Sequence, residues 1–351
     1  MSEENKKCVG IIFGGQSNEH AVSIESAREI LNALESDINK KKFSAKVFYI
    51  NKHGKWFSND ESLKVLKDNN ILENINLQLP NRTLNIIDLI DFEEIDIWFP
   101  IIHGANGEDG TIQGFLKFTQ KPIVGSGILG SALGMDKIIM KLIFSYLKIP
   151  QVNYHIIQNK DLTDENNLKI IHDEITNKLK LPYFIKPANS GSSIGISKVR
   201  DKSDINAALQ KAWTYDHRII VEEGLEVREL EVGIIGKSNL IASEIGEVNY
   251  SSDWYDYDSK YKLNNKFIIP ANIDKNLRKR IQTLSIESCM FLSINIFARV
   301  DFFLEKTTNN LFLNEINTVP GFTKNSLFPL LWRSSGLEIN ELVAKIIEYC
   351  F

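Results

Sequence analysis

Three oxygen-bearing side chains near the carboxyl end of the sequence are the strongest candidates for chemistry. Asp301 belongs to the segment Arg299-Val300-Asp301, and Glu315 and Asn317 belong to the segment 314–317. Side chains alternate between the two faces of a strand, so the three groups can converge if these segments pair as antiparallel strands. Hard oxygen ligands of this kind suit Mg²⁺ that bridges substrate phosphates. A hairpin that simply exposes polar side chains to water explains the same residues equally well.

Two separated lysines are candidate contacts for a polyphosphate. Lys186 follows an apolar strand-like run, and Lys137 follows Gly134-Met135-Asp136 at a predicted helix start. Burying an unpaired ammonium is costly, and a nucleotide phosphate would pair with it. The alternative is that both ammonium groups extend to water, and for Lys137 taken alone this is the simpler interpretation.

Glycine-containing turns provide further candidate binding groups. The loop 189–195 combines small residues with N–H and hydroxyl donors that suit phosphate oxygens, but such loops are also common in ordinary turns. In the turn 103–110, His103 could bind a ligand or handle a proton, although a single histidine is more often structural. Glu19 follows Gly14-Gly15 and could equally be an exposed residue of a first helical turn.

Several other enzyme classes lack their motifs in this sequence. There is no GK[ST] of a Walker A loop, no HExxH and no GxSxG. The residues 10–15 lack the GxGxxG spacing, so a hydride-transfer dehydrogenase is a weak rival.

The elements that must position these residues predict an α/β fold with three domains. Strands at 9–13, 46–50 and 95–102 alternate with helices, which implies a parallel sheet whose functional turns share one crevice. The further expected elements are a helix at 136–147, a hairpin over 181–199, a strand at 219–223, an antiparallel pair at 298–304 and 311–316, and a helix at 337–349. The predicted domains are 1–124, 125–221 and 222–351, and the polar segments 159–167 and 249–266 are predicted loops.

Composition restricts the class of protein. The chain has 351 residues, of which 43% are hydrophobic and 25% are charged, with a net charge of −4. This is typical of a globular protein and argues against a disordered chain, a fibre or a nucleic-acid binder. The cysteines Cys8, Cys289 and Cys350 form no CxxC pair, and no stretch approaches the roughly 20 apolar residues of a membrane span. We therefore predict a cytoplasmic protein.

Taken together, these residues resemble the D-alanine–D-alanine ligase family of the ATP-grasp superfamily. The resemblance runs through nearly the whole chain in order: 14–23, 103–114, 134–137, 186–195, 255–261, 299–301 and 314–323. It implies a three-domain ATP-grasp architecture with an N-terminal, Rossmann-like parallel sheet. It also implies that ATP activates one D-alanine as an acyl phosphate, which a second D-alanine attacks to give D-alanyl-D-alanine for peptidoglycan synthesis. Positioning and charge stabilisation are most of what such an enzyme supplies.

The resemblance also implies roles for individual residues. For the substrates, Glu19 would anchor the first ammonium, His103 would lie near its carboxylate, and Ser326 would bind the second carboxylate. Arg299 and the N–H of Gly321 would stabilise the tetrahedral oxyanion. The implied ATP contacts are Lys137, Lys186, Ser193, Glu222, Glu223, Leu225 and Glu229, and Ser192 would be a catalytic residue of the same phosphate-covering loop as Ser193. Asp301, Glu315 and Asn317 would bind two Mg²⁺ ions, with Mn²⁺ as a substitute, and the family suggests a homodimer.

The segment 249–266 resembles a loop that closes over the site and excludes water. Within it, Lys260 would reach the transferred phosphate, and Tyr261 would hydrogen-bond with Ser192 and Glu19. Related ligases that use D-lactate have phenylalanine at the Tyr261 position, so tyrosine favours an amine nucleophile. Trp254 stands where the family has phenylalanine, which leaves the aromatic character intact and affects only local loop packing. The alternatives are a D-alanine–D-serine ligase and a non-catalytic nucleotide-binding protein.

Overall fold

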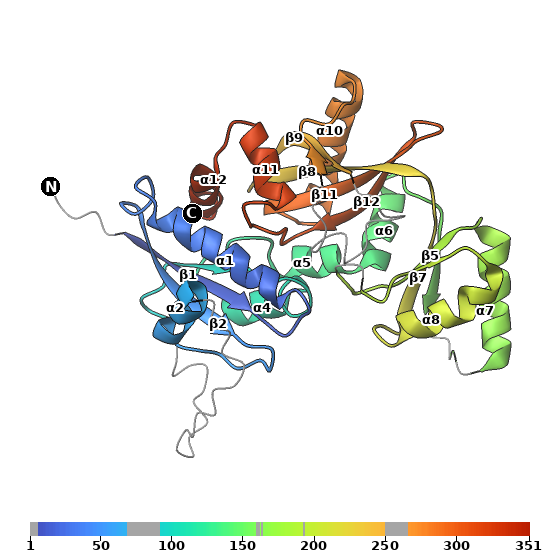
Figure 1. Ribbon diagram of the computed structural model, residues 1–351, viewed down its shortest axis with the longest axis horizontal. Helices are drawn as coiled ribbons and strands as arrows, with labels where there is room; N and C mark the ends of the chain where they lie inside the picture. The colour runs from blue at the N-terminus through green and yellow to red at the C-terminus, as the bar shows by residue number, and fades with distance from the viewer. Residues whose placement is uncertain (1–5, 69–91, 159–161, 163, 192–193, 250–265) are drawn as a thin grey trace, which may run out of the picture.

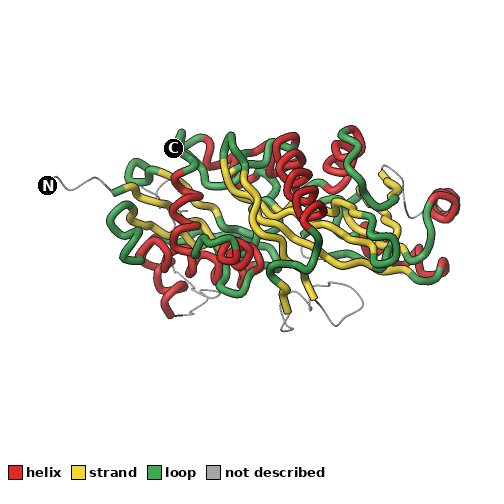
Figure 2. Tube along the Cα trace, turned by 90° about the horizontal axis from the view of Figure 1, so that it is seen from above, coloured by secondary structure: helices red, strands yellow, loops and turns green. Residues whose placement is uncertain are grey.

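The computed structural model describes residues 6–68, 92–158, 162, 164–191, 194–249 and 266–351. These residues form three sheets with helices packed on them (Figure 1). Seen from above, the molecule is elongated (Figure 2). No helix among the described residues combines the length and the apolar character that crossing a membrane requires.

The N-terminal sheet is parallel, as the alternation of strands and helices predicted. Its strand order is β2-β1-β3, with β1 at Lys7–Gly14, β2 at Phe43–Ile50 and β3 at Ile97–Pro100. The helices of this unit are α1 (His20–Glu35), α2 (Asn59–Asp68) and α4 (Thr111–Lys117). Gly14 ends β1 at a φ of +92°, and a Cβ there would lie 2.1 Å from the Ile50 carbonyl oxygen. Glycine is therefore required where the chain turns toward Glu19.

The second sheet is antiparallel and lies at the opposite end of the molecule (Figure 1). Its order is β4-β7-β5-β6, with bounds Tyr154–Gln158, Arg218–Glu223, Tyr183–Pro187 and Ser197–Val199. The helices α7 (Glu165–Lys178) and α8 (Ile205–Trp213) share a buried apolar core with it, and a short 3-10 turn at Lys202–Asp204 precedes α8. The predicted pairing of 181–187 with 196–199 is confirmed by β5 and β6.

The third sheet is also antiparallel and has the order β10-β9-β8-β11-β12. Its strands are Lys266–Ile268, Ile241–Asn249, Val227–Gly236, Ile296–Glu305 and Leu311–Asn317 in that order. The helices of this part are α10 (Lys275–Phe291), α11 (Leu327–Ser334) and α12 (Ile339–Glu348). The predicted antiparallel pair at 298–304 and 311–316 is confirmed by β11 and β12.

Two helices, α5 (Ile128–Met135) and α6 (Lys137–Tyr146), lie in the middle of the molecule between the outer sheets (Figure 1). Met140 and Phe144 of α6 belong to the apolar core of the five-stranded sheet. Ile138 of the same helix packs with Ala188 and Ile220 of the four-stranded side. Because α6 is apolar on two sides, it contacts both sheets and fixes where its lysines lie.

Two predicted loops differ in how far the structure describes them. The prediction of a loop over 159–167 is wrong for residues 165–167, which form the first turn of α7 behind the capping carboxylate of Asp164. Asp164 accepts a hydrogen bond from the Asn166 N–H, which stabilises a helix start in this polar segment. The predicted loop 249–266 begins at the last residue of β9 and ends at the first residue of β10, and its residues 250–265 lie outside the described ones.

Candidate active site

The β11–β12 hairpin brings the predicted metal ligands together. In its register Asp301 lies opposite Glu315, and Arg299 lies opposite Asn317. Directly opposite residues project to the same face of a sheet, so all four side chains share one face. The Asp301 side chain is 12% exposed and that of Glu315 is 29% exposed, so neither is an ordinary surface group.

Cationic side chains lie against these carboxylates. The Arg299 guanidinium donates from Nε and Nη2 to the two oxygens of Asp301, both at 2.7 Å. Its Nε also lies 2.6 Å from Oε2 of Glu231, which the sequence analysis did not single out. Lys137 Nζ lies 3.8 Å from Oε2 of Glu315. The hairpin face therefore combines anionic oxygens with cations that can stabilise negative charge.

The chemistry of this donor set fits Mg²⁺. Two carboxylates and one amide provide hard oxygen atoms. Among the residues that the structure describes, Oδ1 of Asn317 accepts one hydrogen bond, from the Val319 N–H at 2.9 Å. An amide oxygen has two lone pairs, so one remains for a ligand. Among the described residues, no group of three or more His, Cys, Asp or Glu side chains is arranged for a metal. Mg²⁺ needs no such group, because it commonly takes one or two carboxylates together with water and phosphate oxygens.

A cavity of about 810 Å³ lies next to the hairpin, between strands of the four- and five-stranded sheets. This volume is within the range of small-molecule sites. Its lining includes Asp301 and Glu315 and every predicted ATP contact that the structure describes, namely Lys137, Lys186, Glu222, Glu223, Leu225 and Glu229. Residues that lie up to 178 positions apart in the sequence therefore surround one space beside the candidate metal ligands.

Lys137 and Lys186 are both buried, and each ammonium group donates to an oxygen of the protein. The interpretation that these ammonium groups extend to water is therefore wrong. Lys137 Nζ donates to the Ser190 carbonyl oxygen at 2.5 Å, and its backbone N–H donates to the Ala188 oxygen at 3.1 Å. Lys186 Nζ donates to Oε2 of Glu222 at 2.5 Å. The first lysine thereby holds the chain that enters the 189–195 loop, and the second is fixed by a carboxylate of the cavity.

Glu222 is a buried carboxylate shared by two lysines. Its Oε2 binds Lys186, and its Oε1 lies 3.1 Å from Nζ of Lys141 on α6. Burial alone would raise the pKa of Glu222, but the two ammonium groups outweigh burial and lower the pKa to about 2. Burial lowers the pKa of Lys141. Burial also acts to lower the pKa of Lys186, but Glu222, Glu315 and Glu229 together outweigh it and raise that pKa.

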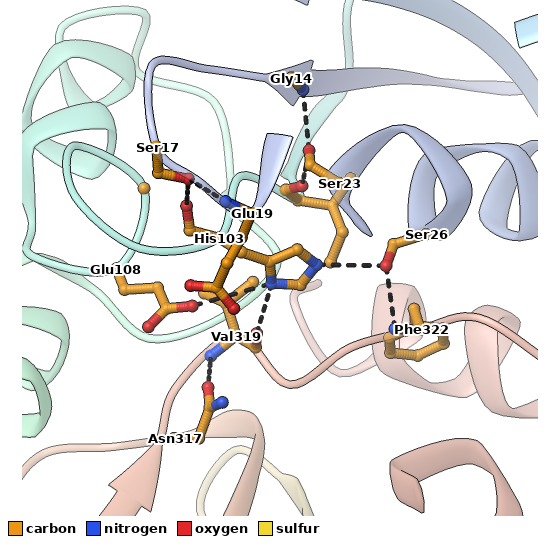
Figure 3. A network of polar contacts seen from close by, with 12 residues as sticks. Gly14, Ser17, Glu19, Ser23, Ser26, His103, Glu108, Asn317, Val319 and Phe322 are labelled. Atoms are coloured by element: carbon orange, nitrogen blue, oxygen red, sulfur yellow. Dashed lines mark hydrogen bonds and ion pairs between the residues drawn. The ribbon is translucent and has the colours of Figure 1, made fainter. Parts of the chain in front are cut away.

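A second polar cluster surrounds His103, at the carboxyl end of β3 (Figure 3). Its Nδ1 lies 2.9 Å from the Val319 carbonyl oxygen and its Nε2 lies 3.1 Å from Ser26 Oγ. Ser26 Oγ in turn accepts a hydrogen bond from the Phe322 N–H at 3.1 Å. The imidazole thus holds the segment that follows β12, which carries Gly321.

Carboxylates adjoin this imidazole. Oε1 of Glu108 lies 3.7 Å from His103 Nδ1. Burial alone lowers the pKa of His103, but Glu108, Glu19 and the Val319 carbonyl together raise it above its ordinary value. The pKa of Glu108 is raised, mainly by burial and also by the charge of Glu19, against the opposing effect of His103. This cluster can hold a proton at His103, in the electrostatic field of the Glu19 carboxylate.

The expected meeting of the two N-terminal turns is confirmed, and Glu19 also borders Gly191, in the loop that follows β5. Ser17 Oγ, in the turn after β1, donates to the His103 carbonyl oxygen at 2.6 Å. Oε2 of Glu19 lies 3.2 Å from where a Cβ on Gly104 would be and 3.4 Å from where one on Gly191 would be. The Glu19 carboxylate therefore lies between the turn that carries Gly104 and Gly191, which lines the cavity.

The remaining predicted residues fall into two groups. Gly321 and Ser326 are neighbours, since a Cβ on Gly321 would lie 2.8 Å from Ser326 Oγ, and Ser326 precedes α11. Ser192, Ser193, Lys260 and Tyr261, together with Trp254, lie outside the described residues.

Several polar groups of the site were not predicted from the sequence. Lys141 lies four residues after Lys137 within an otherwise apolar helix, and this spacing is a signal that could have identified it. Arg218 holds both oxygens of Asp136, the capping residue of α6, at 2.6 and 2.7 Å. No short-range pattern reveals that contact, because the two residues are 82 positions apart.

Comparisons with known proteins identify the family of this chain. Residues 8–126 match the family described as "D-ala D-ala ligase N-terminus", and residues 143–348 match "D-ala D-ala ligase C-terminus". The chain belongs to the D-alanine–D-alanine ligase family. A D-alanine–D-alanine ligase of Prochlorococcus marinus subsp. pastoris is 61% identical over 99% of both chains, and one from Prochlorococcus marinus strain MIT 9515 is 60% identical over the same shares.

Solved structures of ligases have the same fold. The D-Ala:D-Ser ligase VanG of Enterococcus faecalis has a TM-score of 0.83 and 33% identity, covering 99% of this chain and 100% of its own. The D-alanine–D-alanine ligase of Coxiella burnetii has a TM-score of 0.78 and 27% identity, covering 98% and 94%. The predicted α/β fold of the ATP-grasp type, with an N-terminal parallel sheet, is confirmed.

Proposed function

We propose that this ligase-family chain joins two molecules of D-alanine in an ATP-dependent reaction that supplies peptidoglycan precursors. The observation that carries the proposal is the cavity in which Lys137 and Lys186 face the Asp301–Glu315 pair. Such a site can bind a nucleotide polyphosphate and aim its terminal phosphoryl group at a carboxylate. The relatives that are about 60% identical over nearly the whole chain support the same activity.

The chemistry proceeds in two steps in this proposal. The carboxylate oxygen of the first D-alanine attacks the terminal phosphorus of ATP, which gives an acyl phosphate and ADP. The amine of the second D-alanine then attacks the acyl carbon, loses a proton, and phosphate leaves with its bonding electron pair. Activation is needed because a carboxylate is anionic and has no good leaving group.

Within this scheme, the cavity residues bind and orient ATP. Lys137 and Lys186 contact the phosphates, Glu222, Glu223 and Leu225 border the adenine, and Glu229 binds the ribose. Asp301, Glu315 and Asn317 hold two Mg²⁺ ions, which neutralise phosphate charge when bound, and Mn²⁺ can substitute. The acidic hairpin supports this assignment because its oxygen ligands lie on one face next to the lysines.

The His103 cluster and its surroundings bind the amino acids. Glu19 binds the first ammonium, His103 lies near its carboxylate, and Ser326 binds the second carboxylate. Arg299 and the Gly321 N–H stabilise the oxyanion of the tetrahedral intermediate. The guanidinium has five donors, so its contacts to Asp301 and Glu231 are compatible with a further acceptor.

Residues outside the described ones complete the proposal. Ser192 and Ser193 contact the phosphates, Lys260 reaches the transferred phosphoryl group, and Tyr261 bonds to Ser192 and Glu19. Segment 249–266 excludes water from the acyl phosphate. We further propose domains at 1–124, 125–221 and 222–351, a homodimer, and a cytoplasmic location, which the three free cysteines support.

The product formed from competing amino acids tests the proposal. Purified protein is given ATP, Mg²⁺ and equal D-alanine and D-serine, and the products are separated by mass. We expect D-alanyl-D-alanine to dominate. The fold likeness to a D-Ala:D-Ser ligase makes the mixed dipeptide the specific alternative, and its predominance would replace D-alanine by D-serine as the second substrate. Absence of ATP turnover with either amino acid would instead favour a non-catalytic nucleotide-binding protein.

A further inference from the structure

Lys141 is a buried charged residue that the proposed mechanism does not use. It lies on α6, four residues after Lys137, and its side chain is 1% exposed. Residues four apart lie on one face of a helix, so the two lysines project in the same direction. Lys137 lines the cavity, whereas Lys141 lies behind the cavity wall that Glu222 and Lys186 form.

The surroundings of Lys141 show why its ammonium is held in place. Nζ lies 3.1 Å from Oε1 of Glu222, but without the angle of a hydrogen bond, and 5.5 Å from the centre of the Tyr154 ring. Removing an ammonium from water is costly unless a counter-charge compensates it. Glu222 is that counter-charge, and the face of Tyr154 adds a weaker attraction.

The three buried groups carry an excess of positive charge. Two ammonium groups share one carboxylate, and Lys186 takes the oxygen that Lys141 leaves. When all three groups are ionised, two positive charges and one negative charge give a net charge of +1 at the wall of the cavity. A polyphosphate in that cavity is attracted by this excess, and the attraction is stronger than in water because the groups are buried.

The position of α6 makes this arrangement rigid. Met140 and Phe144 anchor the helix in the core of the five-stranded sheet, and Arg218 holds its capping residue Asp136. Lys141 therefore approaches Glu222 from a fixed helix, so the carboxylate cannot turn freely toward Lys186 alone.

We propose that Lys141 is a positioning residue for the nucleotide phosphates: it fixes Glu222 through Oε1 and supplies the excess charge that lets Lys186 act on a polyphosphate. The proposal rests on the proposed ATP-dependent function and adds a residue to it. Lys141 acts through Glu222 and Lys186 and does not itself border the cavity.

Calorimetric binding of ADP and of adenosine, each with Mg²⁺, to the full chain tests this role. Lys141→Met keeps a long, unbranched side chain and removes the charge. We expect ADP to bind roughly tenfold more weakly. Adenosine, whose adenine Glu222 borders in the proposed site, should lose clearly less affinity, at most about threefold, because it carries no phosphates. In steady-state assays, KM for ATP should rise by a similar factor while KM for D-alanine and kcat stay within about twofold.

Three further variants separate this role from general loosening of the fold. Lys148→Met removes an exposed lysine just beyond the same helix and should leave ADP binding unchanged. Phe144→Leu loosens the buried face of α6 without a charge change and should affect ADP and adenosine alike. In a Glu222→Gln background, Lys141→Met should change ADP affinity by less than about twofold, because the two residues act as a unit.

The outcomes distinguish the proposals. Equal loss of ADP and adenosine in Lys141→Met, or unchanged ADP affinity, would overturn the role of Lys141. If Lys141→Met does not fold, Lys141→Arg takes its place, because arginine keeps the positive charge. The role of Lys141 would be overturned if Lys141→Arg bound ADP more than about tenfold more weakly than the unchanged protein while adenosine affinity was retained. If the unchanged chain forms no dipeptide and Lys141→Met still weakens ADP selectively, the ligase function fails and the role of Lys141 stands.

Discussion

At the scale of single residues, a substitution of Glu315 tests the proposed metal site with little expected effect on the stability of the fold. Glu315→Ala removes a proposed ligand and a loose contact at 3.8 Å to Lys137. We expect turnover to fall at least about 100-fold, because charge on the transferred phosphoryl group loses its stabilisation. Unfolding free energy should change by less than about 1 kcal/mol, since the pair is partly exposed.

The measurement combines a phosphate-release assay with urea unfolding. Glu305→Ala, at the other end of β11, is the matched control and should retain activity. Near-normal turnover of Glu315→Ala would place the metal elsewhere in the molecule.

His103 should make the stability of the protein depend on pH. Its folded pKa is raised above 6.5, so its contribution is fully present below pH 6.5 and is lost as pH rises through the folded pKa. The raised pKa of Glu108 acts in the same direction from pH 4.5 upward. We therefore expect the Tm of the unchanged protein to fall more steeply above pH 6.5 than the Tm of His103→Gln.

Thermal unfolding monitored by circular dichroism from pH 5 to pH 9 checks this expectation. His172→Gln, on α7, serves as the comparison and should keep the slope of the unchanged protein. Parallel Tm curves for His103→Gln and the unchanged protein would show that His103 binds its proton no more tightly after folding.

At the scale of secondary-structure elements, the N-terminus of α6 is a joint between the two sheets that form the cavity. The Asp136 carboxylate caps the helix by accepting a hydrogen bond from the Ile139 N–H. It also accepts hydrogen bonds from the guanidinium of Arg218 in β7. Asp136→Ala removes both contacts, and we expect a loss of about 2 kcal/mol of unfolding free energy. Asp164→Ala removes only an exposed cap, on α7, and should cost about 1 kcal/mol. Equal losses in urea unfolding would mean that the contact to Arg218 contributes nothing.

Sequence periodicity predicted the elements whose patterns are local. The strand expected at 9–13 appears as β1, and the antiparallel pair expected at 298–304 and 311–316 appears as β11 and β12, which only a short turn separates in the sequence. The order β10-β9-β8-β11-β12 could not be predicted, because β8 pairs on one side with β11, which begins 60 positions after β8 ends. The partner of Lys141 could not be predicted for the same reason, since Glu222 is brought to it only by the packing of α6 against β7.

At the scale of the whole molecule, the two ends of the chain share one apolar core. Buried residues of β1 and α1 belong to the same cluster as buried residues of α11 and α12. Leu342 of α12 has no exposed surface in this cluster, although it lies more than 300 positions after β1. The N-terminal elements that carry Glu19 and His103 thus share their core with the C-terminal helices.

Because of this shared core, we expect a cavity-forming substitution in α12 to lower the stability of the N-terminal sheet as well as that of the C-terminal helices. Leu342→Ala should lower the unfolding free energy by about 2–5 kcal/mol, because it leaves a cavity where the helix meets the N-terminal unit. In a background where the other four tryptophans are replaced by phenylalanine, fluorescence reports on Trp98, buried in the N-terminal sheet, and far-ultraviolet circular dichroism reports on all the helices and strands. We expect both transitions to move together in urea, whereas Met290→Ala on the exposed side of α10 should shift neither. If the dichroism transition moved and the fluorescence transition did not, the N-terminal sheet would be independent of α12.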